Sequence, residues 1–374
     1  MNITILGSGF AALTAIKQVR KQSPQAEITV IAPTPNLVYL PSIIWIPAGL
    51  RKGSDLRINL GNFYRKMKVN HIHANVQNVT NGGRTVVTDN GEFQNDGLII
   101  ASGGRFIKKL PGIEHVITPC EGIEAAEKIR DRLDQMTGGT IAIGFGGNPK
   151  EPSAMRGGPM FEFLFGIDNL LKKQGRRDKF KIIFFNPAEK PGARLGDTVP
   201  ERIVSMMKDK GIETHLGHKM VGFETNKVKT EGGDIDADLI LFMPGMSGPK
   251  WSMESDMPLS EGGLIKANEF CQVDGLEKTY VAGDSGSFPG PQWQAKQAHA
   301  ADIQAEAAAG NLIKELNGEN NYQPIKHELI CIIDSLTHGM LIKRTESGQT
   351  MTPPLKVLHY AKRFFEWWYL RSYR

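Results

Sequence analysis

The chain opens with Met1-Asn-Ile-Thr-Ile-Leu-Gly-Ser-Gly-Phe-Ala-Ala12, a stretch that predicts the first strand, turn and helix of a dinucleotide-binding fold. Ile3–Leu6 is typical of a buried strand, and Leu13–Arg20 of a helix. The GxGxxA turn between them suits a pyrophosphate, because glycine allows a close backbone approach and the helix N-terminus offers free N–H groups. A second strand, Glu27–Ile31, follows at the expected distance. The candidate cofactor contacts in the turn are Gly7, Gly9, Phe10, Ala11 and Ala12.

The end of the second strand departs from the usual pattern. An acidic residue there normally binds the ribose hydroxyls, whereas this chain has Ala32-Pro33-Thr34. We therefore expect Thr34 or the backbone to hold the ribose; the alternative is that the chain binds no nucleotide.

Composition sets the broad class. A length of 374 residues suggests two or three domains, and the net charge of +5 is too diffuse for a nucleic-acid-binding protein. Three cysteines are too few for a disulfide scaffold, and no apolar run has transmembrane length. Because the first strand begins without a basic-then-apolar leader, we expect a cytoplasmic protein.

Two further segments would complete the first nucleotide site. The apolar, proline-broken stretch 37–49 either lines a flat ligand through Pro41 or covers the core. Residues 96–104 predict a buried strand whose small last residues let a dinucleotide press against the backbone. These small residues are Ala101, Ser102 and Gly103. Between the two segments, residues 56–67 are expected to be helical.

Residues 105–268 predict a second α/β domain. Thr140–Gly147 repeats the strand and glycine turn, but Pro149 and Pro152 stand where the helix should begin. Prolines there spoil the N–H cradle that binds phosphate. The domain is therefore expected to keep the architecture of a nicotinamide-binding domain without its site, with a helix that begins late, at Phe161.

The chain then returns to the first domain. The strand 278–284 ends in Gly-Asp, which puts one carboxylate at the sheet edge where a polyol such as ribitol can bind it. The alanine-rich segment 294–316 predicts a helix whose first turn faces the ring end of the same ligand. The candidate contacts in these two segments are Gly283, Asp284, Lys296 and Gln297.

The last segment, Pro353–Arg374, is dense in aromatic and basic residues. Such a mixture suits the headgroup region of a bilayer. Drawn as a helix, it places Leu355, Leu358, Phe365 and Trp368 on one face. The alternative is a helix docked on the protein's own core or on a dimer partner.

The predicted fold class is thus α/β, with two Rossmann-like dinucleotide-binding domains, the second inserted in the first, and a C-terminal membrane-associating segment. We expect no metal site. The expected boundaries are 1–104 with 269–325 for the first domain, 105–268 for the second and 326–374 for the C-terminal region.

Together these motifs resemble the two-dinucleotide-binding-domain flavoproteins and, within them, the sulfide:quinone oxidoreductase family. The likeness is specific at Gly158–Glu162, Cys331–Asp334 and the C-terminal segment. It implies that FAD is held by the first domain, that a redox-active cysteine pair faces the flavin, and that a membrane quinone enters near the tail. The quinone-binding residues that it implies are Ile330, Tyr360, Phe364 and Phe365.

The chain departs from that family in its cysteines. Cys120 and Cys331 match two of three functional cysteines, whereas Arg156 stands at the position of the third. The resemblance implies an atypical branch in which Cys120 and Cys331 form the redox pair and Glu162 manages protons. A thioether between Cys120 and the flavin, and two unrelated buried thiols, are the open alternatives. Cys271 matches no functional position, and we interpret it as a buried apolar-type residue.

The predicted reaction is flavin-dependent oxidation of sulfide to zero-valent sulfur or polysulfide, with two-electron reduction of a membrane quinone. HS⁻ can open a disulfide to leave a persulfide and a thiolate, and a flavin is needed to carry the electrons. Nearby lysines and arginines are expected to lower the thiol pKa values. The predicted partners are sulfide, quinone and a membrane surface, with a homo-oligomer bound peripherally on the cytoplasmic side.

Three other functions fit parts of the pattern. A single-subunit NADH:quinone oxidoreductase would share the architecture but needs an intact second glycine turn. The flavoprotein subunit of a sulfide dehydrogenase would pass electrons to a cytochrome and would be exported. A flavin-binding sensor or membrane-surface adaptor would bind the cofactor without turnover.

Overall fold

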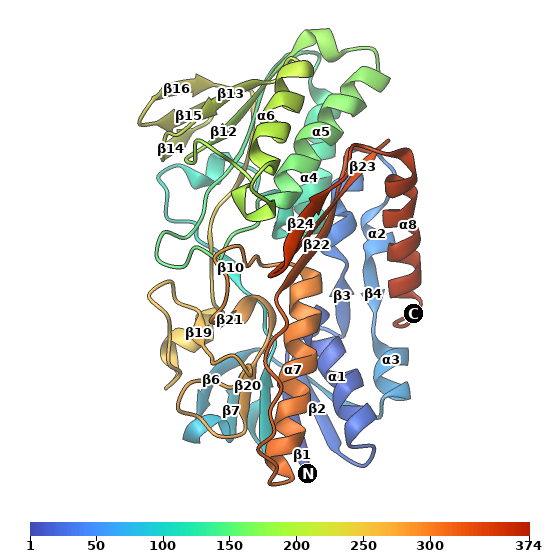
Figure 1. Cartoon of the computed structure of the whole chain (residues 1–374), viewed down its shortest axis with the longest axis vertical. Helices are drawn as coiled ribbons and strands as arrows, with labels where there is room; N and C mark the ends of the chain where they lie inside the picture. The colour runs from blue at the N-terminus through green and yellow to red at the C-terminus, as the bar shows by residue number, and fades with distance from the viewer.

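The fold is built on two open parallel sheets, which the computed structural model of residues 1–374 places toward opposite ends of the long axis (Figure 1). In spatial order, the first consists of β20 (Thr279–Val281), β9 (Gly97–Ile100), β1 (Asn2–Leu6), β2 (Glu27–Ala32) and β5 (Val69–His73). The second consists of β13 (Glu213–Leu216), β12 (Phe180–Asn186), β11 (Gly139–Phe145) and β17 (Leu239–Met243). All neighbours within both sheets are parallel. Parallel strands are covered on both faces, which accounts for their largely apolar sequences.

The second sheet is an insertion into the first. The chain completes β1, β2, β5 and β9, then builds the second sheet, and returns in β20 with Val281 opposite Ile100. The carboxyl ends of β1, β9 and β20 therefore meet at one edge. Ligands of open α/β sheets bind at such an edge.

Eight α-helices flank the sheets, and α1 and α7 pack against each other on one face of the first sheet (Figure 1). Close packing is possible because α7 buries alanines such as Ala301, Ala305 and Ala308. The helices are α1 (Phe10–Gln22), α2 (Gly53–Leu56), α3 (Gly61–Lys66), α4 (Ile123–Gln135), α5 (Gly158–Lys173), α6 (Val199–Asp209), α7 (Ala298–Leu316) and α8 (Lys356–Leu370).

Shorter elements complete the chain. The small sheets pair β3 (Asn36–Val38) with β4 (Arg57–Asn59), β10 (Arg105–Phe106) with β18 (Met246–Ser247), and β19 (Ile265–Lys266) with β21 (Gly286–Ser287). Three-stranded sheets are formed by β6 (Val76–Thr80), β7 (Thr85–Thr88) and β8 (Gly91–Gln94), by β14 (Met220–Glu224), β15 (Lys227–Thr230) and β16 (Gly233–Asp236), and by β22 (Glu328–Asp334), β23 (Gly339–Thr345) and β24 (Gly348–Met351). The 3₁₀ turns are η1 (Leu40–Trp45), η2 (Asn81–Gly83), η3 (Ile113–His115), η4 (Pro119–Glu121), η5 (Arg177–Lys179), η6 (Ala193–Leu195), η7 (Lys250–Glu254) and η8 (Gly283–Ser285).

Two expected helices differ from the structure. Residues 56–67 do not form one helix, because β4 interrupts them and pairs Ile58 with Leu37 across an antiparallel ladder. The helix expected from Phe161 begins earlier, at Gly158. Proline is well tolerated in the first turn of a helix, where its missing N–H would have had no intrahelical partner, and Pro159 occupies that turn.

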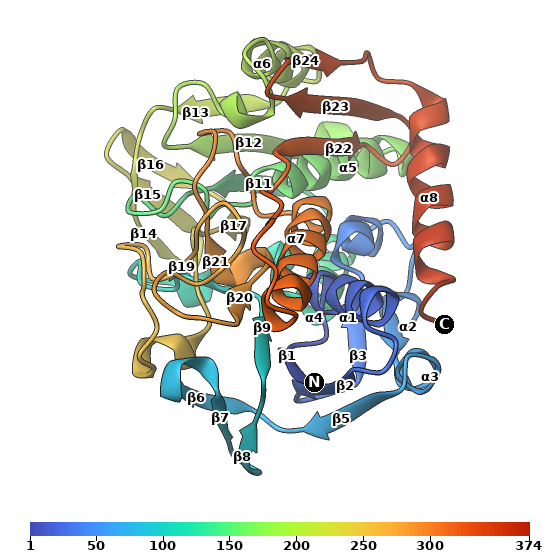
Figure 2. The ribbon, with the colours of Figure 1, turned by 60° about the horizontal axis from the view of Figure 1, so that its bottom comes forward.

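One apolar core joins the two sheets to the C-terminal region. It includes Ile5 of β1, Phe184 of β12, Leu312 of α7 and Ile342 of β23, all fully buried. A smaller core lies on the first sheet and includes residues of the segment 251–267. The C-terminal helix α8 runs along the outer edge of the molecule in both views (Figures 1 and 2). None of the helices combines the length and the apolar character needed to cross a membrane.

The tight turn after β1 depends on Gly7. Its φ is +110°, and a side-chain carbon there would lie 2.3 Å from the carbonyl oxygen of Ala101. We expect Gly7→Ala to lower the thermal unfolding midpoint by several degrees, because it combines backbone strain with a steric clash. The matched control is Gly9→Ala, since a side-chain carbon at Gly9 meets no atom within 4 Å. Equal midpoints for the two variants in a calorimetric scan would contradict this account.

Candidate active site

The edge of the first sheet brings the predicted dinucleotide-binding residues together. Gly7 lies against Ala101, and a side-chain carbon at Gly283 would be 3.3 Å from that of Ala11. Helix α1 begins beside them with no capping side chain and no acidic residue in its first turn. Its N–H groups and positive dipole end are therefore available to an anion. Gly9 and Gly103 both face open space.

Asp284 supplies a carboxylate at the same edge, in η8 directly after β20. Its Oδ2 forms an ion pair with Arg156, and Oδ1 has no protein partner. The two side chains are 13% and 16% exposed, respectively. A free carboxylate oxygen beside an uncapped helix N-terminus matches the polyol and pyrophosphate of FAD, so the donor set fits this cofactor.

The other predicted cofactor contacts surround this edge at different depths. Lys296 is buried, its Nζ contacts the carbonyls of Gly283 and Gly286, and burial lowers its pKa to about 8. Ala12 is fully buried, whereas Phe10 and Ser102 are half-buried. Pro41 lies in η1 and is half-buried, Gln297 directly precedes α7 and makes no side-chain capping bond, and Thr34 is exposed.

Other residues of the same chain occupy the space around the second glycine turn. A side-chain carbon at Gly245 would be 2.3 Å from the backbone of Gly147. Asn148 donates from Nδ2 to the carbonyls of Met246 (2.9 Å) and Gly262 (3.0 Å). The strand β12 ends in a neutral, buried Asn186, which donates to the carbonyl of Phe145 at 2.8 Å. The position at which a carboxylate would bind ribose therefore carries an amide that the fold already uses.

Between the two sheets, Glu162 of α5 is the centre of a buried polar cluster. It forms an ion pair with Lys362 of α8, and its Oε1 accepts the N–H of Asp334 at 2.8 Å. Asp334 contacts His359 Nδ1 at 2.7 Å and accepts the indole N–H of Trp45 at 3.0 Å. The cluster thus connects α5, β22, α8 and η1. Burial raises the pKa of Glu162 to about 7, against the opposing effect of Lys362.

Cys120 in η4 and Cys331 in β22 are both free thiols near this cluster. Cys120 is 5% exposed, and Cys331 is partly exposed. Glu162 and Lys362 act electrostatically on both sulfurs, and Arg156 acts on Cys120 as well. Cys271 is separate from them: it is fully buried and its thiol contacts the carbonyl of Gln304.

The expectation that nearby cations lower the thiol pKa values is wrong. The protein packed around Cys120 and Cys331 raises the pKa of each to about 12, because burial penalises the thiolate more than the cations favour it. At neutral pH both groups are therefore neutral thiols in this arrangement.

The residues that the family resemblance implied for quinone binding lie on two elements. Ile330 is half-buried in β22 and directly precedes Cys331 in the sequence. Tyr360, Phe364 and Phe365 lie on α8 and are 63%, 63% and 51% exposed. They form an exposed aromatic surface instead of a closed pocket.

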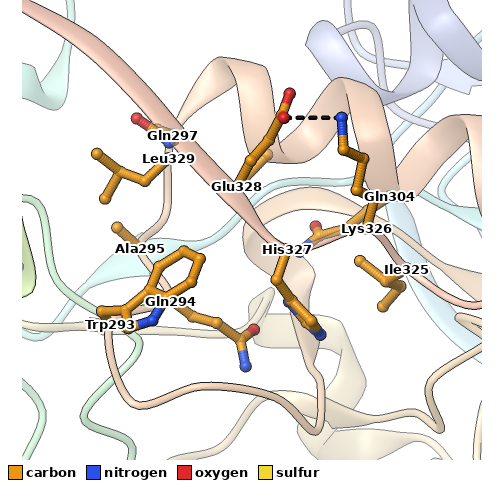
Figure 3. A pocket seen from close by; sticks show the side chains of 11 residues that line it. Trp293, Gln294, Ala295, Gln297, Gln304, Ile325, Lys326, His327, Glu328 and Leu329 are labelled. Atoms are coloured by element: carbon orange, nitrogen blue, oxygen red, sulfur yellow. Dashed lines mark ion pairs between the residues drawn. The ribbon is translucent and has the colours of Figure 1, made fainter. Parts of the chain in front are cut away.

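A separate, shallow hollow lies beside the start of β22 and the N-terminus of α7 (Figure 3). The lining residues are Trp293, Gln294, Ala295, Gln297, Ala300, Gln304, Ile325, Lys326, His327, Glu328 and Leu329. Glu328 contacts Lys326 at 2.8 Å and His299 at 2.7 Å. Of the predicted site residues, it contains only Gln297.

Sequence reasoning missed the two polar side chains that α8 contributes to the buried cluster. His359 and Lys362 are three residues apart, which places them on the same face of a helix. This spacing predicts a polar face on the helix. We overlooked it because the segment is rich in aromatic residues. Asp334 was part of a family motif without a role, and the structure gives it one as the partner of His359.

Comparison with known proteins supports an oxidoreductase of this architecture. The family model described as pyridine nucleotide-disulphide oxidoreductase matches residues 1–305. The type II NADH:quinone oxidoreductase of Staphylococcus saprophyticus is 25% identical over 356 residues, which cover 88% of this chain and 86% of that protein. The enzyme of the same name from Staphylococcus aureus strain MSSA476 is 25% identical over 384 residues, with 95% and 93% covered.

Solved structures show the same fold. The sulfide:quinone oxidoreductase of Aquifex aeolicus superposes with a TM-score of 0.89 at 20% identity, covering 100% of this chain and 91% of that one. The NAD-dependent persulfide reductase of A. fulgidus has a TM-score of 0.71 at 17% identity, covering 93% and 65%.

The fold, the sheet-edge site and the family match together define an FAD-binding oxidoreductase, and the two staphylococcal relatives and the Aquifex aeolicus protein named above are quinone oxidoreductases. More narrowly, the chain belongs to the pyridine nucleotide-disulphide oxidoreductase family. FAD is its cofactor, and the residues that surround Gly9 and Asp284 fit that molecule.

The raised pKa of Glu162 predicts a pH dependence of stability. The folded chain keeps a proton at Glu162 up to about pH 7, whereas the unfolded chain releases it near the ordinary value of 4.5. The stabilisation is therefore full below about pH 4.5 and is lost as the pH rises through about 7. Glu162→Gln has no such proton to lose.

The measurement is urea unfolding of the wild type and of Glu162→Gln at about pH 5 and about pH 8. We expect the wild type to lose more stability than the variant between these two values. The exposed substitution Glu319→Gln is the control and should behave as the wild type does. Parallel pH profiles for all three proteins would contradict the assignment.

Proposed function

We propose that the chain is an FAD-dependent sulfide:quinone oxidoreductase of an atypical, two-cysteine type. The observation that carries the proposal is that Cys120 and Cys331, from distant elements, both lie under the electrostatic influence of the Glu162–Lys362 pair. In the same interpretation, residues 1–104 with 269–325 bind FAD, residues 105–268 form the degenerate second domain, and residues 326–374 serve the quinone and the membrane.

The proposed reaction begins with Cys120 and Cys331 joined as a disulfide. HS⁻ attacks one sulfur, the S–S bond breaks, and the site then holds a persulfide on one cysteine and a thiolate on the other. A second HS⁻ removes the outer sulfur of the persulfide as polysulfide, and re-forming the Cys120–Cys331 disulfide then releases two electrons. FAD held at the sheet edge by the residues around Gly9 and Asp284 would supply the two-electron acceptor between this pair and the quinone. Each sulfide oxidised to zero-valent sulfur releases two electrons, which with two protons convert the quinone to a quinol.

The raised thiol pKa values decide the protonation state of the sulfur that leaves the disulfide. A cysteine whose pKa is about 12 is a neutral thiol at neutral pH, so the departing thiolate takes up a proton. Glu162, with a pKa of about 7, is suited to hold a proton beside the site and to release it during turnover. Lys362 provides the counter-charge when Glu162 is ionised.

The alternative with independent support is an NADH:quinone oxidoreductase, because the curated relatives bear that activity in their names. Two features of the second domain argue against it. Asn148 ties the second glycine turn to residues 246 and 262 of the same chain, and Asn186 replaces the carboxylate that would bind ribose.

We also propose that α8 rests on a membrane surface and takes the quinone from it. Its outer face exposes large apolar side chains at Leu355, Val357, Tyr360, Phe364, Phe365, Trp367 and Trp368. Exposed Lys356, Arg371 and Arg374 accompany them. Aromatic and basic residues together favour an anionic lipid surface, and several copies in a homo-oligomer would strengthen the attachment.

The electron donor that supports quinone reduction, sulfide or NADH, distinguishes the two activities. We expect the purified, FAD-loaded protein to reduce a short-chain quinone anaerobically with sulfide and to remain inactive with NADH. Turnover with NADH alone would establish the alternative and would assign the cysteines a structural role.

The cysteine pair is tested by Cys331→Ser. We expect this substitution to abolish sulfide-dependent quinone reduction while FAD remains bound, because HS⁻ then has no disulfide to open. Cys271→Ser is the matched control: it removes another buried thiol, and we expect it to keep turnover. Near-normal sulfide turnover in Cys331→Ser would overturn the proposed mechanism.

Membrane attachment is tested by Phe364→Glu combined with Trp367→Glu. Because each buried large apolar side chain contributes roughly 1.5–3 kcal/mol, we expect the double variant to lose most of its cosedimentation with anionic vesicles. The control is Val221→Glu, which alters a 53% exposed apolar residue on β14, an element distant from α8 (Figure 1). Equal vesicle binding by the double variant and the control would exclude α8 as the membrane contact.

A further inference from the structure

We propose that Tyr369 of α8 is a positioning residue for FAD: its ring holds Phe10, which begins the helix at the candidate cofactor edge. The C-terminal region then contributes to cofactor binding in the first domain. The proposal rests on FAD being held at the start of α1, and it is independent of the electron donor.

Phe10 stands where the candidate cofactor edge meets α8. It is the first residue of α1 and directly follows Gly9, the open position of the turn. No side chain caps this helix, so the N–H groups of its first turn are the ones available to a pyrophosphate. Ser8 is fastened on the other side, because its Oγ donates to the carbonyl of Asn36 at 3.0 Å. The orientation of Phe10 is set by what its ring packs against.

Three aromatic rings meet at this point. The ring centroid of Phe10 lies 5.7 Å from that of Tyr39 and 5.7 Å from that of Tyr369, and the two tyrosine rings are 5.8 Å apart. These separations are typical of interacting aromatic pairs. Tyr39 is 3% exposed and directly precedes η1, which contains the predicted cofactor contact Pro41. Tyr369 therefore packs on two segments of the chain that lead to the candidate cofactor edge.

The hydroxyl of Tyr369 connects the same ring to both helices beside that edge. It lies 3.4 Å from each carboxylate oxygen of Asp302 on α7, and Thr14 of α1 donates to this carboxylate at 2.6 Å. Asp302 directly follows Ala301, whose side-chain carbon would be 3.5 Å from one placed at Gly283. One side chain of α8 thus joins α1 and α7 where they flank the predicted FAD contacts.

The packing at the end of α8 gives Tyr369 a fixed place. Leu370 and Tyr373, close to it in sequence, are fully buried, and the ring of Tyr373 lies 5.2 Å from that of Tyr369. Tyr369 is held by these surroundings and in turn restricts the ring of Phe10. A binding turn that is ordered before its ligand arrives binds more tightly, because less conformational entropy is lost on binding.

A double-mutant cycle of Phe10→Leu and Tyr369→Leu tests the contact. The FAD-loaded proteins are diluted at a temperature at which the wild type releases part of its cofactor, and the fluorescence of the released FAD gives the dissociation constant. We expect each single variant to bind FAD about three- to tenfold more weakly, the equivalent of one aromatic pair. The double variant should be within about twofold of the weaker single variant, because both changes remove the same contact. Tyr369→Phe keeps the ring and should recover most of the affinity.

Leu370→Ala is the matched control, because it loosens the same end of α8 and leaves the ring of Tyr369 in place. We expect it to lower the thermal unfolding midpoint and to bind FAD nearly as the wild type does. Three results would overturn the proposal: an unchanged FAD affinity in Tyr369→Leu, single effects that multiply in the double variant, or a loss in Leu370→Ala or Tyr369→Phe as large as in Tyr369→Leu. If the wild type has no sulfide turnover, the proposed function fails, and the FAD measurements still decide the role of Tyr369.

Discussion

A buried carboxylate must be paired, and this requirement holds the candidate active site together. Glu162 and Asp334 both lie in the protein interior; Glu162 forms an ion pair with Lys362 of α8, and Asp334 contacts Nδ1 of His359 on the same helix. Removing one partner from such a pair leaves an uncompensated buried charge, at a cost of about 3–5 kcal/mol. The position of α8 is therefore fixed by the same charges that shape the surroundings of Cys331. Helix α8 lies on the outer edge of the molecule and still contributes side chains to the buried candidate site.

The two sheets each have a glycine turn of the dinucleotide-binding type, but only the first turn is open to a phosphate. After β1, the turn is open at Gly9 and the helix begins at once, so its N–H groups are available to phosphate. After β11, residues 146–157 intervene before α5, and Asn148 fastens the turn to its own chain. In both sheets the strand before the turn pairs in parallel with its neighbours. The difference lies in the few residues between the strand and the helix.

Local pattern predicted the parts of this fold that depend on local physics. The first strand, its glycine turn and α1 follow from residues 3–20, and Asp284 was expected at the sheet edge because a strand ending in Gly-Asp leads there. The interruption of residues 56–67 by β4 was missed, since its ladder with β3 is made by a partner distant in sequence. The thiol pKa values were mispredicted for a related reason: charged residues can be read from a sequence, but the packing that desolvates Cys120 and Cys331 cannot. The Arg156–Asp284 pair joins the loop before α5 to the turn η8 after β20, and such a long-range contact has no signature along the chain.

The burial of the last residues has a consequence for the way the protein is made. Leu370 and Tyr373 are fully buried, and the ring of Tyr373 lies 5.1 Å from that of Phe63. The first sheet is also incomplete until β20 is present, and β20 is synthesised long after β1. During translation the early strands emerge from the ribosome without the partners that cover them, and the core is complete only after Leu370 and Tyr373 have emerged. Until then the nascent chain exposes apolar surface of the kind that chaperones bind.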